Sequence, residues 1–128
     1  MVLNGIDLKK CTVGVMGITF KENCPDIRNS KILDILDELK KWGINVIVDD
    51  PWVDPQELKN IHDIDIETIS SKNQVDALIV AVGHNEYRSK SAEELKSYCK
   101  GPNPVIADVK SIYEKKHLID VGFSVFRL

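Results

Sequence analysis

Side chains suited to holding an anionic ligand are concentrated within residues 12–30. Among its residues are an aromatic ring, two cations and a carboxylate, namely Phe20, Lys21, Arg28 and Asp26. A lysine offers a compact point charge, and an arginine can grip a phosphate through two parallel hydrogen bonds. The pattern favours a site for a phosphorylated or nucleotide-like ligand. The alternative is that Asp26 or Glu22 neutralises both cations at the surface.

The elements that position these side chains are a predicted strand and a predicted helix. Val13 to Met16 is an uncharged run typical of a buried parallel strand, and residues 31–42 have the apolar spacing of an amphipathic helix. Asn29 and Ser30 can each cap that helix through a side-chain oxygen. The loop between strand and helix is longer than the usual length of about two to six residues, and such loops are often functional.

Gly14 and Gly17 precede this loop as Gly-x-x-Gly. The dinucleotide fingerprint Gly-x-Gly-x-x-Gly, which rests a pyrophosphate on a helix N-terminus, is not complete. We interpret the two glycines as residues of tight packing and of a turn. The motif therefore supports a Rossmann-like shape without supporting NAD binding by this chain alone.

Several further side chains have both a structural and a functional interpretation. Cys24 lies near a helix start, where a thiolate would be stabilised, but no histidine adjoins it, so a packed thiol is favoured. Asp49 stands where Rossmann folds often place a ribose-binding carboxylate, and a turn built by residues 49–52 is slightly favoured instead. His84 follows the third predicted strand, where it could touch a ligand or bond the backbone.

Lys110 follows the fourth predicted strand, where it could meet a phosphate or a ribose hydroxyl, or remain a solvated surface lysine. A histidine and two aspartates alternate with isoleucines over residues 62–66. That alternation is more typical of a half-exposed strand or loop than of a metal site, so no metal ligand is assigned.

The whole chain alternates short apolar segments with amphipathic ones. Predicted strands cover residues 12–16, 44–48, 77–82, 105–107 and 123–126, and predicted helices cover residues 31–42, 55–58, 91–99 and 112–119. This order predicts an α/β fold, a Rossmann-like three-layer sandwich with a mainly parallel sheet of five or six strands. Ligands of such sheets bind beyond the carboxyl ends of the strands, where the Lys21, His84 and Lys110 loops begin.

The composition excludes several classes of partner. The chain has 128 residues, is 43% hydrophobic and 29% charged, and has a net charge of −3, so it lacks the basic footprint of nucleic-acid binding. No apolar run approaches the roughly 20 residues of a membrane span. The three cysteines form no CxxC pair, which fits a reducing cytoplasm rather than a disulfide scaffold or a zinc site.

One long motif resembles a known family. Residues 17–30, Gly-Ile-Thr-Phe-Lys-Glu-Asn-Cys-Pro-Asp-Ile-Arg-Asn-Ser, closely resemble the signature that opens the C-terminal domain of UDP-sugar 6-dehydrogenases. These enzymes belong to the UDP-glucose/GDP-mannose dehydrogenase family. Asp50-Pro51 and the segment 107–113 also resemble that domain. The form of the first motif is most similar to the branch that acts on UDP-N-acetylhexosamines.

The resemblance implies a role in a nucleotide-sugar 6-dehydrogenase, a cytoplasmic enzyme of polysaccharide biosynthesis. Such an enzyme oxidises the C6 alcohol of a UDP-hexose or UDP-N-acetylhexosamine to the uronic acid with two NAD+. An N-terminal domain binds NAD, and a central region carries the catalytic cysteine and lysine and forms a homodimer. The C-terminal domain clasps the UDP part of the substrate.

Residue by residue, the resemblance implies substrate contacts for Phe20 and Lys21 and a contact with the NAD side of the cleft for Arg28. Lys110 stands where relatives often have an arginine that touches the substrate, apparently across the subunit interface. Cys24 does not match the catalytic cysteine. We therefore expect residues 12–128 to be the UDP-sugar-binding domain and residues 1–11 to be the remnant of a connection. Alone, the chain is expected to be inactive, because thiohemiacetal chemistry and hydride transfer need groups that it lacks.

Two other classes were compared with this interpretation. A signalling receiver domain needs an acidic pair after its first strand and an aspartate after its third, whereas here Asp49-Asp50 follows the second predicted strand and the third ends in Val82-Gly83. A non-catalytic nucleotide-binding or assembly module with a Rossmann-like fold agrees with all the residue patterns. Only the resemblance favours the dehydrogenase over that module.

Overall fold

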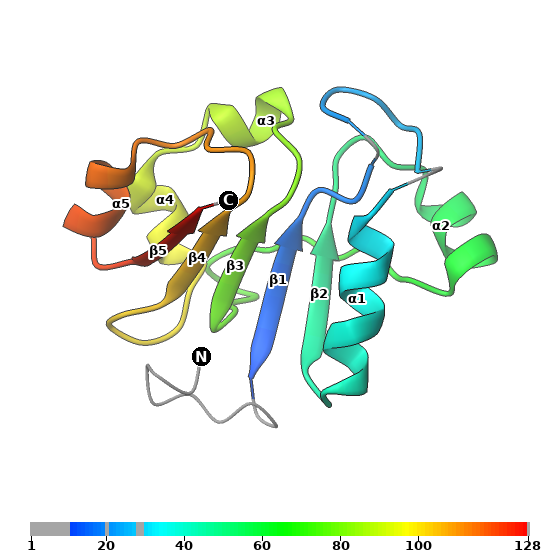
Figure 1. The fold of residues 1–128 in the computed structure, drawn as a ribbon, viewed down its shortest axis with the longest axis horizontal. Helices are drawn as coiled ribbons and strands as arrows, with labels where there is room; N and C mark the ends of the chain where they lie inside the picture. Colours follow the sequence, from blue (N-terminus) through cyan, green and yellow to red (C-terminus); the bar gives the residue numbers. More distant parts are fainter. Residues whose placement is uncertain (1–10, 20, 28–29, 128) are drawn as a thin grey trace.

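The computed structural model describes residues 11–19, 21–27 and 30–127. Their centre is a parallel sheet of five strands in the order β2-β1-β3-β4-β5, with helices on both faces (Figure 1). The strands are β1 Thr12–Met16, β2 Asn45–Asp49, β3 Ala77–Val80, β4 Val105–Asp108 and β5 Ser124–Arg127. The predicted Rossmann-like α/β class is confirmed, and the sheet is wholly parallel.

Three of the four predicted helices are shorter in the structure, and the one predicted over residues 55–58 is longer. They are α1 Ile32–Lys41, α2 Pro55–His62, α3 Asn85–Arg88, α4 Ala92–Ser97 and α5 Lys115–Asp120. The sequence did not predict α3, because four residues are too few to show a helical period. The helix predicted over residues 112–119 begins only at Lys115, since the backbone at Ile112 and Tyr113 first turns back onto Asp108.

Alternation along the strands divides the core into two layers. Val13 and Val15 of β1 point to one face of the sheet, where they pack with Leu36 of α1 and Leu58 of α2. Met16 belongs to the other layer, which holds the buried side chains of α4 and α5. Both faces of β1 are therefore buried, which explains why its sequence is an uncharged run instead of an alternating one.

The helix caps confirm some local predictions and correct one. Ser91 caps α4 by accepting a hydrogen bond from the Glu94 backbone N–H at 3.1 Å, as the capping-box pattern predicts. Ser30 does not cap α1. Its hydroxyl donates instead to the Ile18 carbonyl at 2.7 Å, and the N-cap residue of α1 is Lys31, without a side-chain cap. Asn29, the other predicted cap, lies outside the described residues.

The topology places three loops side by side at the carboxyl edge of the sheet. Strand β1 lies between β2 and β3, so the loop that follows β1 is flanked by the chain segments that leave β2 and β3 (Figure 1). This is the edge at which parallel sheets bind ligands. Within the described residues, no helix combines the length and apolar composition that a membrane crossing requires.

Candidate functional site

The centre of the carboxyl edge is the buried carboxylate of Asp50, one residue beyond β2. Its Oδ2 accepts hydrogen bonds from the backbone N–H groups of Ile18 at 2.8 Å and Thr19 at 3.3 Å. Its Oδ1 accepts from the N–H groups of Trp52 at 2.7 Å and Val53 at 3.2 Å, which builds the turn after β2. One side chain thus closes its own turn and anchors the start of the neighbouring β1 loop.

His84, after β3, completes this arrangement. Its Nδ1 lies 2.8 Å from the Asn23 backbone nitrogen, and its Nε2 lies 3.1 Å from Asp50 Oδ2. Because a backbone N–H can only donate, Nδ1 must be the unprotonated acceptor and Nε2 must carry the proton in the neutral ring. The geometry therefore assigns the Nε2–H tautomer, which donates to the Asp50 carboxylate.

The residues on either side of the loop tip are both fixed to this buried pair. Thr19 Oγ1 lies 3.2 Å from His84 Nε2 and donates to the Lys21 carbonyl at 3.0 Å. Asn23 bonds the ring through its backbone N–H, and its Oδ1 accepts from the Asn85 N–H at 2.9 Å. Lys21 and Glu22 lie between these two anchored residues, and we call them the loop tip.

Aromatic side chains enclose the imidazole. The Trp52 ring stacks on the His84 ring with centroids 6.1 Å apart, and its indole N–H donates to Glu86. Tyr87 lies 5.5 Å from the imidazole, and its hydroxyl donates to the Asp49 carbonyl at 2.7 Å. The Asp50 and His84 side chains are consequently shielded from solvent, each with 0% exposure.

The two neighbouring aspartates have opposite electrostatic properties. Burial opposes ionisation of Asp50, but the hydrogen bonds from His84, Ile18 and Trp52 outweigh it and lower the pKa of this carboxyl. For Asp49 burial dominates, and it raises the pKa despite a hydrogen bond from the Ile69 N–H. Asp50 is thus stabilised as an anion by the hydrogen-bond donors around it.

The structure places the predicted ligand residues as follows. Lys21 is exposed at the loop tip, and among the described residues no carboxylate lies within ion-pair distance of its ammonium. Lys110 is exposed just after β4, at the same edge of the sheet. Phe20 and Arg28 lie outside the described residues. The substrate and cofactor contacts assigned to these four side chains therefore stay predictions.

The structure shows the contacts or exposure of the three side chains that had two interpretations, Asp49, His84 and Cys24. The turn interpretation of residues 49–52 is confirmed, with Asp50 as the residue that builds it. His84 bonds the backbone, and Cys24 is a half-buried free thiol. The role of Asp50 as an anchor was not predicted from the sequence. Its signal was present, because aspartate before proline at a strand end is typical of a side-chain-closed turn.

The surroundings of Gly14 and Gly17 do not fit a pyrophosphate site. A Cβ on Gly14 would lie 2.7 Å from Ile69 Cδ1, and a Cβ on Gly17 would lie 2.6 Å from Val82 Cβ. The space beside both glycines is therefore filled by side chains and not open to a pyrophosphate, which confirms the packing interpretation. Gly17 also has φ +101°, a turn conformation that favours glycine.

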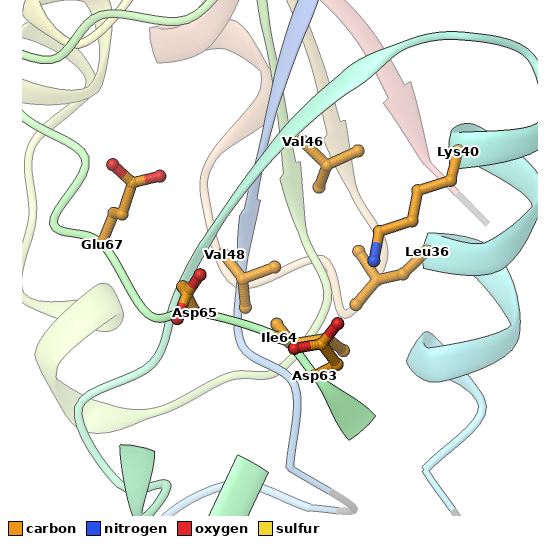
Figure 2. A pocket seen from close by; sticks show the side chains of 8 residues that line it. All are labelled: Leu36, Lys40, Val46, Val48, Asp63, Ile64, Asp65 and Glu67. Atoms are coloured by element: carbon orange, nitrogen blue, oxygen red, sulfur yellow. The ribbon is translucent and has the colours of Figure 1, made fainter. Parts of the chain in front are cut away.

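Two cavities lie elsewhere on the described surface. Figure 2 shows one of about 190 Å³ between α1 and the segment after α2, where Leu36, Val46 and Val48 form the floor. Another, of about 440 Å³, lies between the first residues of α4 and α5. Neither is lined by Lys21 or Lys110. Within the described ranges no three His, Cys, Asp or Glu side chains are grouped so as to hold a metal ion.

Comparisons with known proteins agree on one family. Residues 14–115 match the model of the UDP-glucose/GDP-mannose dehydrogenase family, UDP binding domain. The whole chain is 35% identical to the UDP-N-acetyl-D-glucosamine 6-dehydrogenases of Salmonella typhi and Pseudomonas aeruginosa, covering 28% and 29% of their lengths. A UDP-glucose 6-dehydrogenase of Rhizobium meliloti is 30% identical over 93% of the chain and 27% of its own length.

A solved structure has the same fold. The NDP-N-acetyl-D-galactosaminuronic acid dehydrogenase of Methanosarcina mazei superposes with a TM-score of 0.86 and 27% identity, over 98% of this chain and 26% of that one. This chain thus spans less than a third of the length of its relatives. It belongs to the UDP-glucose/GDP-mannose dehydrogenase family, and the matched residues are those of the UDP binding domain.

Proposed function

We propose that this chain binds the UDP part of a nucleotide sugar at the carboxyl edge of its sheet, with Lys21 on the diphosphate. The observation that supports this most directly is the exposed Lys21 at the loop tip, without a carboxylate partner among the described residues. A lysine ammonium matches the charge of a diphosphate oxygen. Hydrogen bonds of Thr19 and Asn23 fix the backbone on either side of Lys21.

The other assignments extend the same site. We assign Phe20 to the substrate together with Lys21, and Lys110 to a second cationic contact from the loop after β4. Arg28 is assigned to the NAD side of the cleft. The NAD site itself belongs to the part of the enzyme that this chain does not include, in agreement with the filled space beside Gly14 and Gly17.

In the complete enzyme, we propose, the bound UDP-sugar is oxidised at C6 to the uronic acid by two NAD+. The names of the relatives favour a UDP-N-acetylhexosamine or UDP-hexose as substrate. Residues 12–128 then serve as the UDP-sugar-binding domain, and residues 1–11 as the connection to a preceding region. A cytoplasmic homodimer acting in polysaccharide biosynthesis completes the proposal. The isolated chain should be inactive, because the reaction also needs the catalytic cysteine and the NAD site that we assign to the rest of the enzyme.

Calorimetric titration of the 128-residue chain with UDP tests the proposal. We expect measurable binding, weakened about tenfold by Lys21→Ala, because one charge-assisted contact contributes about 1.5 kcal/mol or more. The matched control is Lys41→Ala, which removes another exposed lysine at the C-terminal end of α1. Absence of binding at millimolar UDP, or equal weakening by both variants, would contradict the site. Equal binding of ADP and UDP would indicate a general diphosphate site.

A further inference from the structure

The two attachments of the loop tip converge on one buried ring. Before the tip, Thr19 Oγ1 lies 3.2 Å from His84 Nε2, and after it the Asn23 N–H donates to His84 Nδ1 at 2.8 Å. The ring is 0% exposed and is engaged at both nitrogens. Any rotation of the imidazole would break hydrogen bonds on both sides of the tip at once.

The His84 ring is itself held by a hydrogen bond to Asp50 and by stacking against Trp52. Its Nε2–H donates to Asp50 Oδ2, and Asp50 is fixed by four backbone N–H groups. Trp52 stacks over the imidazole on the solvent side. His84 is therefore inaccessible to a ligand at the edge, yet it determines where the neighbours of Lys21 lie.

We propose that His84 is a positioning residue of the nucleotide site, which acts through its Nδ1 acceptor by holding the loop tip in a binding-competent shape. This rests on the proposed function, because the ligand it serves is the UDP assigned to Lys21. Its contribution is preorganisation: the loop is ordered before the ligand arrives, so binding does not bear that entropy cost. The Asp50 carboxylate selects the tautomer that leaves Nδ1 free to accept.

The hydrogen-bond geometry can be tested without any ligand. In ¹⁵N NMR spectra of the 128-residue chain, we expect His84 to carry its proton on Nε2 and to be unprotonated on Nδ1. The Asn23 amide should exchange with solvent far more slowly than the amides of the loop tip. A proton on Nδ1, or equally fast exchange of these amides, would overturn the inference whether or not UDP binds.

Three substitutions of His84 distinguish the role of its Nδ1 from that of its Nε2. His84→Asn places a carboxamide oxygen near the position of Nδ1 and can still accept from Asn23, whereas His84→Gln places its amide near Nε2 and cannot. We expect His84→Ala and His84→Gln to weaken UDP binding about tenfold, and His84→Asn to restore it to within about threefold of the parent chain. Equal affinities of the Asn and Gln variants would overturn the positioning role.

Loss of stability alone must not mimic this result. Ile44→Ala removes buried side-chain volume at the opposite edge of the sheet and serves as the destabilised control, matched by its thermal midpoint. If it weakens UDP binding as much as His84→Gln, the role of His84 is only structural.

Should the His84 variants not fold, Thr19→Val removes the Oγ1 attachment more gently, and unchanged UDP affinity would count against the inference. Failure of the parent chain to bind UDP would refute the proposed function, while the NMR result still decides the hydrogen-bond geometry.

Discussion

The loops after β1 and after β4 are both fixed by a buried aspartate at the carboxyl edge, but the two carboxylates come from different places. The β4 loop is held by Asp108 of its own strand, which accepts from the N–H groups of Ile112 at 3.1 Å and Tyr113 at 2.9 Å. The β1 loop is held by Asp50 from beyond the neighbouring strand β2 and by His84 from beyond β3.

The sequence distances differ accordingly. Asp108 reaches partners four and five residues away, whereas Asp50 reaches Ile18 and Thr19 across 32 and 31 residues. A local turn can form as soon as its own segment is ordered. The β1 loop takes its shape only when β1, β2 and β3 are assembled, so the shape of the proposed ligand loop is a property of the whole half-sheet.

The largest expected effect is that of removing Asp50. Asp50→Ala leaves four backbone N–H groups and the His84 Nε2–H without this acceptor in the interior. Since an unsatisfied buried donor costs about 1–3 kcal/mol, we expect a loss of about 4 kcal/mol or more in the free energy of unfolding. Asp108→Ala leaves two such donors and should cost about 2–3 kcal/mol. Urea unfolding measures both.

The two variants should also differ in which backbone amides exchange faster with solvent. Amide exchange should accelerate across the β1 loop and at Trp52 in Asp50→Ala, but only around Ile112 and Tyr113 in Asp108→Ala. Equal free-energy losses, or an exchange change confined to residues 50–53 in the Asp50 variant, would contradict the comparison.

The difference between local and long-range hydrogen bonds also explains which features could be predicted from the sequence. The β1 strand and the Ser91 cap follow from residue types within a few positions, and both are confirmed. The pairing of Asp50 with His84 spans 34 residues and leaves no local pattern. The sequence pattern pointed to Asp49, but its carboxylate accepts from the Ile69 N–H. Only the folded turn reveals which of the two neighbouring aspartates faces the loop.

Ser30 shows the other limit of sequence reasoning. A serine before a predicted helix has the composition of a cap, but tertiary structure offers its hydroxyl the Ile18 carbonyl instead. The placement of Lys21 and Lys110 at the ligand edge did follow from the order of strands and helices, because all carboxyl ends of a parallel sheet lie on one side.

Acid should affect the half of the sheet that contains Asp50 in a defined direction. The folded-state pKa of Asp50 is below the ordinary value of 3.8, so the unfolded chain binds its proton first as the pH falls. The stability due to Asp50 is therefore complete above 3.8 and is lost as the pH falls from there through the folded pKa. In an NMR titration of the side-chain carboxyl carbons, Asp50 should titrate below 3.8 and Asp49, whose pKa burial raises, above 3.8. The reverse order would contradict the assignment of Asp50 as the anchoring anion.

The smallest expected effects concern two residues with the same backbone strain. Asn23 in the β1 loop and Ser111 in the β4 loop both have positive φ, 55° and 53°. Ser111→Gly should stabilise the chain by up to about 1 kcal/mol, because glycine adopts this conformation without a steric cost. Asn23→Gly gains less relief, because asparagine tolerates this conformation better than serine, and it loses the Oδ1 acceptor of the Asn85 N–H. We therefore expect no net gain, or a loss of about 0.5 kcal/mol. If thermal unfolding shows equal stabilisation by both substitutions, the Asn23 side chain does not help to hold the β1 loop, and Asn23 contributes only through its backbone bond to His84.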